Sequence, residues 1–529
     1  MKIMQCKWRQ ALIAVLVLFF AFALLAEDKP AGTPPPGKEK DTVSKYKRKT
    51  TETQYLVFMP SRSMFKGKGM KGNLDSVIQT IINRIGATGD EKHKLAFALP
   101  LPTWRKIPKE HFDAILEEAV DVAVKRDIGM YFFVESLEWK DRPDLWNYNQ
   151  KDKPGYDPEN KKNVEWTDWD GTPFPHRYRD WGTPEKMEPV MCYNSPKVLE
   201  EIAGMVKGKV IPRFELVMKK LKKAKKEYLF AGITVGAEQM LPDYSVIDKI
   251  NPRIAKMMEK DKTPKARLGY NALTNKGYGK KKPPKDFAKA LAEINQEYVA
   301  YWCKQLKDAG VPKNKMYTHI AAAAGCPGTK MLEYSKAPNR IAFNKYSRPG
   351  WTTYTAGPLK KDFRLLYEEL KKHGNPHWGG TEANPAFGKG IHPEKYLSWH
   401  FDYGATVIVM NVGATSQGLT NRLEKGVWSE EAIEAYKRFL TGKPLRTNLK
   451  TKPTKGQGEK KSPEKMKETR ERIQGKVKKI QQGIRAWHRE GKDPSAIGEM
   501  MKEFEKLIRS NKIKEAEELL DKALKRLGL

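Results

Sequence analysis

The chain has 529 residues, of which 39% are hydrophobic, enough to bury a sizeable core in one large domain or several smaller ones. Lys and Arg number 99 against 64 Asp and Glu, so the formal net charge is +35 at pH 7. With only 4 cysteines, no CxxC spacing and no HExxH motif, the sequence excludes a disulfide-built scaffold and gives no support for a metal site.

The N-terminus predicts export. Basic residues in the first nine positions precede an apolar run from Ala11 to Ala26. This pattern is typical of a secretory signal peptide, here residues 1–26. Because the run is shorter than the roughly 20 residues of a membrane-spanning helix, we expect cleavage and no stable membrane span afterwards. An uncleaved anchor is the alternative. The expected location is secreted, periplasmic or in the cell envelope.

Residues 27–53 are rich in Pro, Gly and Lys and predict a flexible linker, so the folded region is expected to begin near Gln54. For an exported chain, the strong positive charge indicates an anionic partner, such as a sulfated or uronic polysaccharide or an envelope surface. The export signal makes nucleic acid an unexpected partner. A lysine-rich surface that only keeps the protein soluble is the alternative.

Residues 54–441 predict a barrel. Eight short runs rich in β-forming residues alternate with segments whose apolar residues recur at three- and four-residue spacing. The runs are 54–60, 95–102, 128–136, 229–238, 316–324, 340–346, 377–383 and 405–413. Eight strand and helix repeats are typical of an α/β fold, the (β/α)8 TIM barrel. A doubly wound open sheet is the alternative, but no glycine-rich phosphate loop follows the first run.

A long polar loop is predicted after the third strand, from Trp139 to about Pro196. It holds several tryptophans, among them Trp169. Such a loop either packs over the barrel or stacks its rings on sugars, and the sequence leaves both open. Past the barrel, residues 442–462 predict a second linker and residues 463–529 a helical C-terminal region, either a spacer or a partner-binding module.

Two acids end predicted strands. Glu238 closes the fourth strand, in VGAEQ, and Glu382 closes the seventh, in GGTEAN. The carboxyl ends of barrel strands build the active site, so both side chains are expected on one rim. Two carboxylates placed this way suit cleavage of a glycosidic bond. The alternative for Glu382 is a solvated residue that enters a turn.

At these motifs the sequence resembles the clan of retaining (β/α)8-barrel glycoside hydrolases that includes β-galactosidases, cellulases and β-mannanases. The resemblance covers residues 54–441 and implies that Glu238 is the acid/base and Glu382 the nucleophile. It also implies that Tyr346, at the end of strand six, holds the nucleophile, and that His319 on strand five contacts the sugar. A satisfied core histidine is the alternative for His319.

The sequence departs from the clan at two places. Ala237 stands where the clan usually has Asn, and strand eight lacks the Trp that commonly floors the first sugar site. Trp378 or Trp351 is expected to replace that tryptophan. The remaining candidates for substrate binding are Asn384, Trp169 and Glu135. β-Amylase-like barrels, which invert, are a further alternative.

The sequence therefore predicts an exported glycoside hydrolase, acting on a polysaccharide or oligosaccharide that could be anionic, with no metal or organic cofactor. A glycan-binding or envelope-associated protein without catalysis on the same barrel is the alternative function. No feature of the sequence indicates an oligomeric state.

Overall fold

The computed structural model describes residues 44–60, 74–101, 103–104, 109–179, 184–236, 238, 241–321, 340–353, 359–384, 391–411, 414–415, 418–419, 427–449, 463–509 and 513–529. Contacts divide the chain into two units. The larger spans Lys40–Thr451, and the described part of the smaller lies within residues 463–529. The expected signal peptide lies outside the described residues.

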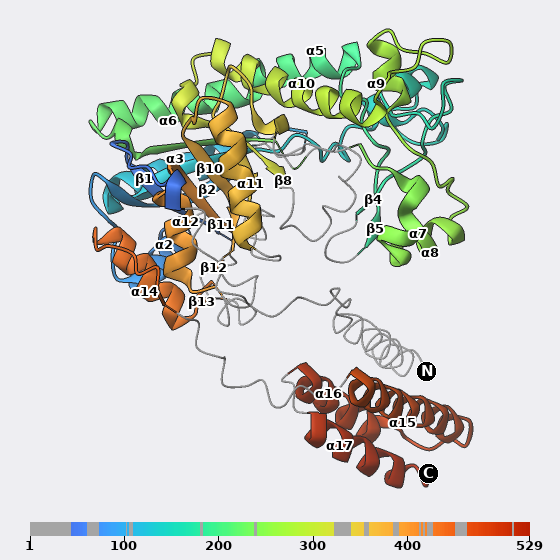
Figure 1. The fold of residues 1–529 in the computed structure, drawn as a ribbon. Helices are drawn as coiled ribbons and strands as arrows, with labels where there is room; N and C mark the ends of the chain where they lie inside the picture. The colour runs from blue at the N-terminus through green and yellow to red at the C-terminus, as the bar shows by residue number, and fades with distance from the viewer. Residues whose placement is uncertain are drawn as a thin grey trace. The chain divides into compact units, whose positions relative to one another are not determined.

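Parallel strands form a nearly closed barrel, as the sequence predicts, and Figure 1 shows helices packed against it. Each strand pairs with the next along the chain, and the last, β11, pairs with the first, β1. The fifth strand is interrupted at His319: its first part, β7, pairs with β6, and its second part, β8, pairs with β9. The strands are β1 (Gln54–Met59), β2 (His93–Leu101), β3 (Gly129–Val134), β6 (Phe230–Val235), β7 (Met316–Thr318) with β8 (Ile320–Ala321), β9 (Gly350–Thr352), β10 (Trp378–Ala383) and β11 (Ala405–Asn411).

Alternating side chains build two apolar layers. On β1, Tyr55, Val57 and Met59 join a cluster that fills the barrel interior, together with Tyr131 and Tyr317 from other strands. The residues between them on β1 belong to the larger cluster, which lies between strands and helices. Successive strand residues point to opposite faces, so every β1 side chain is buried.

Helices cover the outside of the ring. The covering helices are α2 (Leu74–Ile85), α3 (Lys109–Arg126), α5 (Pro196–Met205), α6 (Ile211–Lys223), α10 (Phe287–Asp308), α11 (Leu359–Lys372), α12 (Pro393–Phe401) and α14 (Glu430–Leu440). Short elements build the insertions: α4 (Pro143–Trp146), β4 (Tyr178–Arg179), β5 (Glu185–Lys186), α7 (Ile247–Ile250), α8 (Pro252–Lys260), α9 (Tyr270–Asn275), β12 (Ala414–Thr415) and β13 (Gly418–Leu419). The insertion after β3 contacts the segment after β6, where Tyr178 donates a hydrogen bond to Asp261 at 3.0 Å.

The sixth strand was predicted at 340–346, and this placement is wrong. The structure has β9 at Gly350–Thr352 instead. The side-chain oxygen of Asn344 accepts hydrogen bonds from the backbone N–H groups of Tyr346 and Ser347, at 2.8 and 3.0 Å, and so forms a turn there. A Cβ atom on Gly350 would lie 2.2 Å from the carbonyl oxygen of Thr318, so glycine permits the close approach of β9.

The described ends of both expected linkers are fixed to the barrel. In the first, Arg48 donates hydrogen bonds to the carbonyls of Asn375 and Pro376. Glu52 forms a bidentate ion pair with Arg348. The shorter of its two N–O distances is 2.5 Å. In the second, Arg446 binds Glu394. These contacts attach the described residues next to each expected linker to the barrel.

Glu394 on α12 is 0% exposed and is held by two arginines. It accepts a hydrogen bond from the backbone N–H of Arg446 at 2.7 Å and pairs with the guanidinium groups of Arg446 and Arg438. Burial raises the pKa of Glu394, but the hydrogen bonds from Arg446 outweigh that effect, and its pKa lies below the ordinary value.

Replacing Glu394 with glutamine is expected to lower the free energy of unfolding of the barrel by on the order of 2 kcal/mol, because two arginines lose their partner. Urea unfolding at pH 7 measures this. Glu227→Gln, at an exposed position, is the control and is expected to change stability by less than about 0.5 kcal/mol. Equal stability of the two variants would show that the pair contributes nothing.

The smaller unit is a bundle of three helices, α15 (Pro463–Arg489), α16 (Ser495–Arg509) and α17 (Ile513–Arg526). Its own apolar core includes Ile480, Phe504 and Leu520. This agrees with the helical region predicted there. Within the described residues, no helix is both long enough and apolar enough to cross a membrane.

Candidate active site

Glu382 reaches the rim because two glycines and a bulge precede it. If Gly379 carried a Cβ atom, that atom would lie 2.7 Å from a methyl of Val407. If Gly380 carried one, it would lie 2.8 Å from the ring of His400, so β10 packs tightly on both faces. The pairing register with both neighbouring strands then shifts after Gly380. Such a bulge re-aims the side chains that follow it. Glu382 is held at the strand end, where its carbonyl accepts from the backbone N–H of Thr353 at 2.8 Å.

Glu238 lies in a tight turn beyond the end of β6. Gly236 has a φ of 119°, and Glu238 itself adopts the left-handed conformation with a φ of 56°. The backbone ties this turn to the interrupted fifth strand: the N–H of Glu238 donates to the His319 carbonyl at 3.0 Å, and the His319 N–H donates to Val235 at 2.9 Å. A left-handed glutamate costs about 1–3 kcal/mol, and such strain clusters at functional sites.

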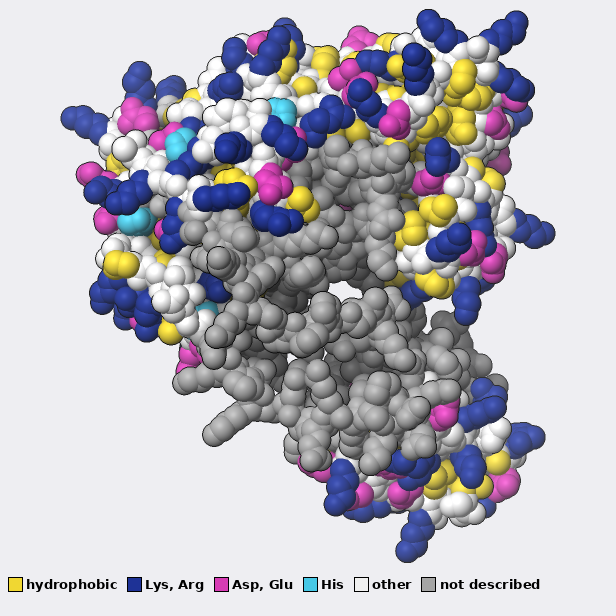
Figure 2. Space-filling model, viewed as in Figure 1, with side chains coloured by type: hydrophobic (Ala, Val, Ile, Leu, Met, Phe, Trp, Pro, Cys, Tyr) yellow, Lys and Arg dark blue, Asp and Glu magenta, His cyan; other side chains and the backbone are white. Residues whose placement is uncertain are grey.

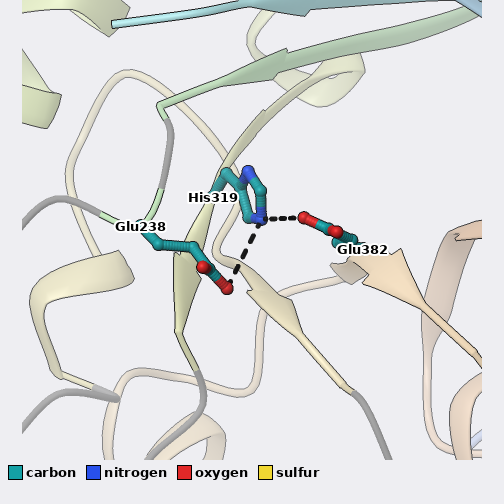
Figure 3. A group of neighbouring side chains, drawn as sticks. All are labelled: Glu238, His319 and Glu382. Atoms are coloured by element: carbon teal, nitrogen blue, oxygen red, sulfur yellow. Dashed lines mark ion pairs between the residues drawn. The ribbon is translucent and has the colours of Figure 1, made fainter. Parts of the chain in front are cut away.

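The two glutamates meet at His319 (Figure 3). Its Nε2 atom lies 3.4 Å from Oε2 of Glu382 and 3.9 Å from Oε1 of Glu238. A carboxylate oxygen of each glutamate and the imidazole nitrogen all lie within 4.8 Å of one another. The side chains of Glu238 and Glu382 are 26% and 16% exposed, whereas that of His319 is 7% exposed. Both carboxylates can therefore be reached from solvent, with the imidazole buried behind them.

Thr352, at the end of β9, completes the cluster and was not predicted from the sequence. Its hydroxyl donates to Oε1 of Glu238 and lies 2.9 Å from Nε2 of His319. Because the hydroxyl hydrogen goes to Glu238, its oxygen accepts the Nε2 hydrogen of His319. Thr352 thus orients Glu238 and His319 together. Thr352 was missed because the sixth strand was predicted at 340–346 and not at Gly350–Thr352.

The charge on His319 follows from its neighbours. Burial alone lowers the pKa of His319, but the hydrogen bond with Glu382 and the charges of Glu238 and Glu382 outweigh burial. The pKa of His319 therefore lies above its ordinary value. Glu135, after β3, raises it further. The protonated imidazole and the ionised forms of the neighbouring carboxylates therefore favour one another.

His319 is expected to make stability pH-dependent. A raised folded-state pKa contributes stability that is complete below the unfolded value of about 6.5 and is lost as pH rises through the folded value. Urea unfolding from about pH 6.5 upward should show this loss in the wild type and a smaller loss in His319→Asn. The control is His176→Asn: burial lowers the pKa of His176 to about 4, so this histidine is neutral throughout that range. Equal slopes in all three proteins would contradict the assignment.

Three of the predicted binding residues do not join the site. Trp351 and Trp378 are both 0% exposed and pack in the layer between strands and helices, with ring centroids 5.9 Å apart. Neither offers a face to a sugar, which corrects the expectation that one of them floors the site. Tyr346 precedes β9 and so lies before the strand whose end it was expected to close.

The remaining predicted residues are placed as follows. Asn384 is half-buried two positions beyond Glu382, and Glu135 is half-buried directly after β3 with its side chain accepting from the Leu137 N–H at 3.1 Å. Both strand ends belong to the rim that carries Glu382. Trp169 is in the insertion, where its ring packs edge-on against Tyr270 at 5.0 Å. Packing is therefore the role that its observed contacts support.

The same three side chains could also hold a metal ion. Each of Glu238, His319 and Glu382 can offer one ligand atom, and among the described residues they form a group close enough to share an ion. A protonated His319 would have to lose its Nε2 hydrogen before it could bind. The site thus suits either a hydrogen-bonded carboxylate pair or a cation.

No protein family model and no curated protein matches the sequence. Among solved structures, a trimodular endoglucanase of the GH5_4 subfamily aligns over 74% of this chain and 61% of its own, with 10% identity and a TM-score of 0.34. This chain therefore spans less than two thirds of that endoglucanase.

An α-amylase from Malbranchea cinnamomea aligns over 74% of this chain and 76% of its own, with 9% identity and a TM-score of 0.33. For a family 1 β-glucosidase from Thermotoga maritima the values are 69% and 85%, with 9% identity and a TM-score of 0.28. Similarities this low carry no argument about activity, which has to come from the side chains themselves.

Proposed function

We propose that this protein is a glycoside hydrolase with Glu238 as acid/base and Glu382 as nucleophile. One observation carries the proposal: carboxylates from the ends of the fourth and seventh barrel strands face each other, with an oxygen of each within 4.8 Å. The pair lies at the carboxyl ends of the strands, the place where barrel enzymes carry their chemistry. A glycosidic bond is a substrate that needs two such acids.

The reaction would run in two steps. Glu382 attacks the anomeric carbon and forms a C–O bond, while the glycosidic C–O bond breaks and Glu238 gives its proton to the leaving oxygen. In the second step Glu238 takes a proton from water, which attacks the same carbon and releases Glu382. The net result is hydrolysis with retained anomeric configuration.

The approach of one oxygen of each glutamate to within 4.8 Å motivates the retaining assignment, which the separation of the two whole carboxyl groups would test. Retaining pairs lie about 5–5.5 Å apart, whereas inverting pairs need about 6.5–9.5 Å to accommodate a water molecule. A cationic His319 would favour ionised Glu382, the form that a nucleophile needs. Glu135 and Asn384 lie at the same rim and are our candidates for sugar hydroxyl contacts.

We further propose that the substrate is a polysaccharide or oligosaccharide outside the cytoplasm. The signal-like N-terminus supports export, and the net charge of +35 supports an anionic sugar polymer. Figure 2 shows Lys and Arg distributed over the visible described surface, without a single dominant patch.

The test is hydrolysis of a panel of neutral, uronic and sulfated glycans, with the first-formed anomer read by proton NMR. Release of the retained anomer is expected. The inverted anomer would reassign Glu382 to a general base. Binding without turnover across the panel would contradict the proposed enzyme and support a glycan-binding barrel.

A metal-dependent hydrolase is the second candidate, because the three ligand atoms lie within 4.8 Å of one another. Dialysis against EDTA separates the two. The carboxylate mechanism predicts unchanged turnover after chelation. Loss of activity that added Zn²⁺ or Mn²⁺ restores would favour the metal.

A further inference from the structure

The net charge of the three-helix unit resides on one helix. α15 holds nine Lys or Arg against three Glu, a net charge of +6. α16 has three cations and three anions, and α17 has four of each, so both are neutral. Beyond Glu471, no acidic residue occurs in the rest of α15. The uneven distribution separates a basic surface from two balanced ones.

Ion pairs neutralise the α15 cations that face α17. Arg472 pairs with Glu517 at 2.5 Å, and Lys476 pairs with Glu517 at 3.1 Å and with Asp521 at 2.6 Å. These contacts consume two of the four carboxylates of α17. The cations on the side of α15 that faces away from α17 do not pair with these carboxylates.

The α15 basic face consists of four exposed side chains: Lys478, Lys479, Arg485 and Arg489. Lys478, Arg485 and Arg489 are seven and four positions apart, so they lie on one side of the helix over about 16 Å, and Lys479 borders them about 100° round the helix from Lys478. Among the described residues, none of the four forms an ion pair within 4.0 Å. Glu490, the next residue after Arg489, is itself paired with Lys492 at 2.8 Å.

The opposite side of α15 is already occupied. Ile473 and Ile480 are each 1% exposed and belong to the core of the bundle. The basic face therefore has no apolar residue to insert into a membrane. None of its four residues is aromatic, and among the large hydrophobic residues exposed in the described chain, Tyr228, Val246 and Leu529, the one aromatic residue, Tyr228, lies in the barrel unit. A flexible polymer with regularly spaced anionic groups fits it best.

We infer that the α15 basic face binds an anionic polysaccharide and holds the barrel on its substrate. This rests on the proposed function, since it assigns a second contact with the same polymer. Binding at two linked sites raises the effective concentration of the second site, and so increases affinity for long chains without changing turnover of short ones. Affinity should also fall as salt rises, because binding releases counterions.

The experiment uses the full chain and polygalacturonate, with dissociation constants measured by titration calorimetry at low and moderate salt. In the face variant, Lys478, Lys479, Arg485 and Arg489 are all replaced by Gln. The matched control carries the same four-charge change on exposed α17 positions: Lys514, Lys522, Lys525 and Arg526 become Gln. We expect the face variant to bind at least about tenfold more weakly and the control less than about threefold.

Equal weakening by both variants, or by neither, would overturn the inference. Tighter binding to double-stranded DNA or to anionic vesicles than to polygalacturonate, with the same dependence on the face, would also overturn it. Circular dichroism verifies that both variants fold. If polygalacturonate binding follows the prediction while no glycan is hydrolysed, the proposed enzyme fails and the polysaccharide surface stands.

Discussion

Replacing Glu382 with glutamine is expected to lower kcat on a responsive glycoside by about 10³-fold or more, with a much smaller change in KM. Glutamine keeps the shape of the side chain and one acceptor oxygen but cannot form the glycosyl ester. Steady-state kinetics with a chromogenic glycoside measures the effect. Glu227→Gln, on the surface, is the control and should leave kcat unchanged.

Azide separates the roles of the two glutamates. In Glu382→Ala, azide can occupy the space of the lost nucleophile, and the glycosyl azide formed should have the inverted configuration. In Glu238→Ala, azide attacks the glycosyl-enzyme intermediate, and the product should have the retained configuration. Identical products from both variants, or full activity in either, would contradict the assignment.

The barrel was predictable because its strands carry strong local patterns. Seven of the eight runs coincide with observed strands, since buried parallel strands are rich in β-forming residues. The sixth could not be found this way. β9 is only three residues long, Gly350–Thr352, and begins with a glycine required by packing. The alternating residues of 340–346 resembled a strand more closely, and the turn at Asn344 is a contact that composition does not reveal.

The two glutamates were predictable from their positions at strand ends, but their partners were not. On a regular strand, Trp378, Gly380 and Glu382 would share one face. The bulge after Gly380 breaks that rule, so Trp378 faces the helices while Glu382 faces His319. Thr352 follows Trp351 on β9 and points the other way, into the site. Sequence patterns identify the elements, whereas bulges and register determine which neighbouring residue is functional.

Glu165 provides a further pH dependence outside the site. It lies in the insertion after β3 and is 0% exposed. The backbone N–H of Ala272 and the thiol of Cys192 approach its carboxyl, yet neither oxygen reaches hydrogen-bond geometry with a partner. Burial raises the pKa of Glu165 to about 8. The neighbouring N–H and thiol groups lower this pKa, but they offset only part of the effect of burial. The side chain is therefore neutral in the folded protein at pH 7.

Glu165→Gln is expected to remove a loss of stability that the wild type suffers between pH 5 and pH 8. The unfolded carboxyl ionises above about 4.3 and the folded one only near 8, so the unfolded state binds fewer protons in between and stability falls as pH rises. The fall should be on the order of 3 kcal/mol and should level off above pH 8. Urea unfolding at pH 5 and pH 8 measures the difference for each protein. The control Glu227→Gln should show the same difference in the free energy of unfolding between pH 5 and pH 8 as the wild type. If Glu165→Gln also shows the wild-type difference, the carboxyl of Glu165 is ionised in the folded protein.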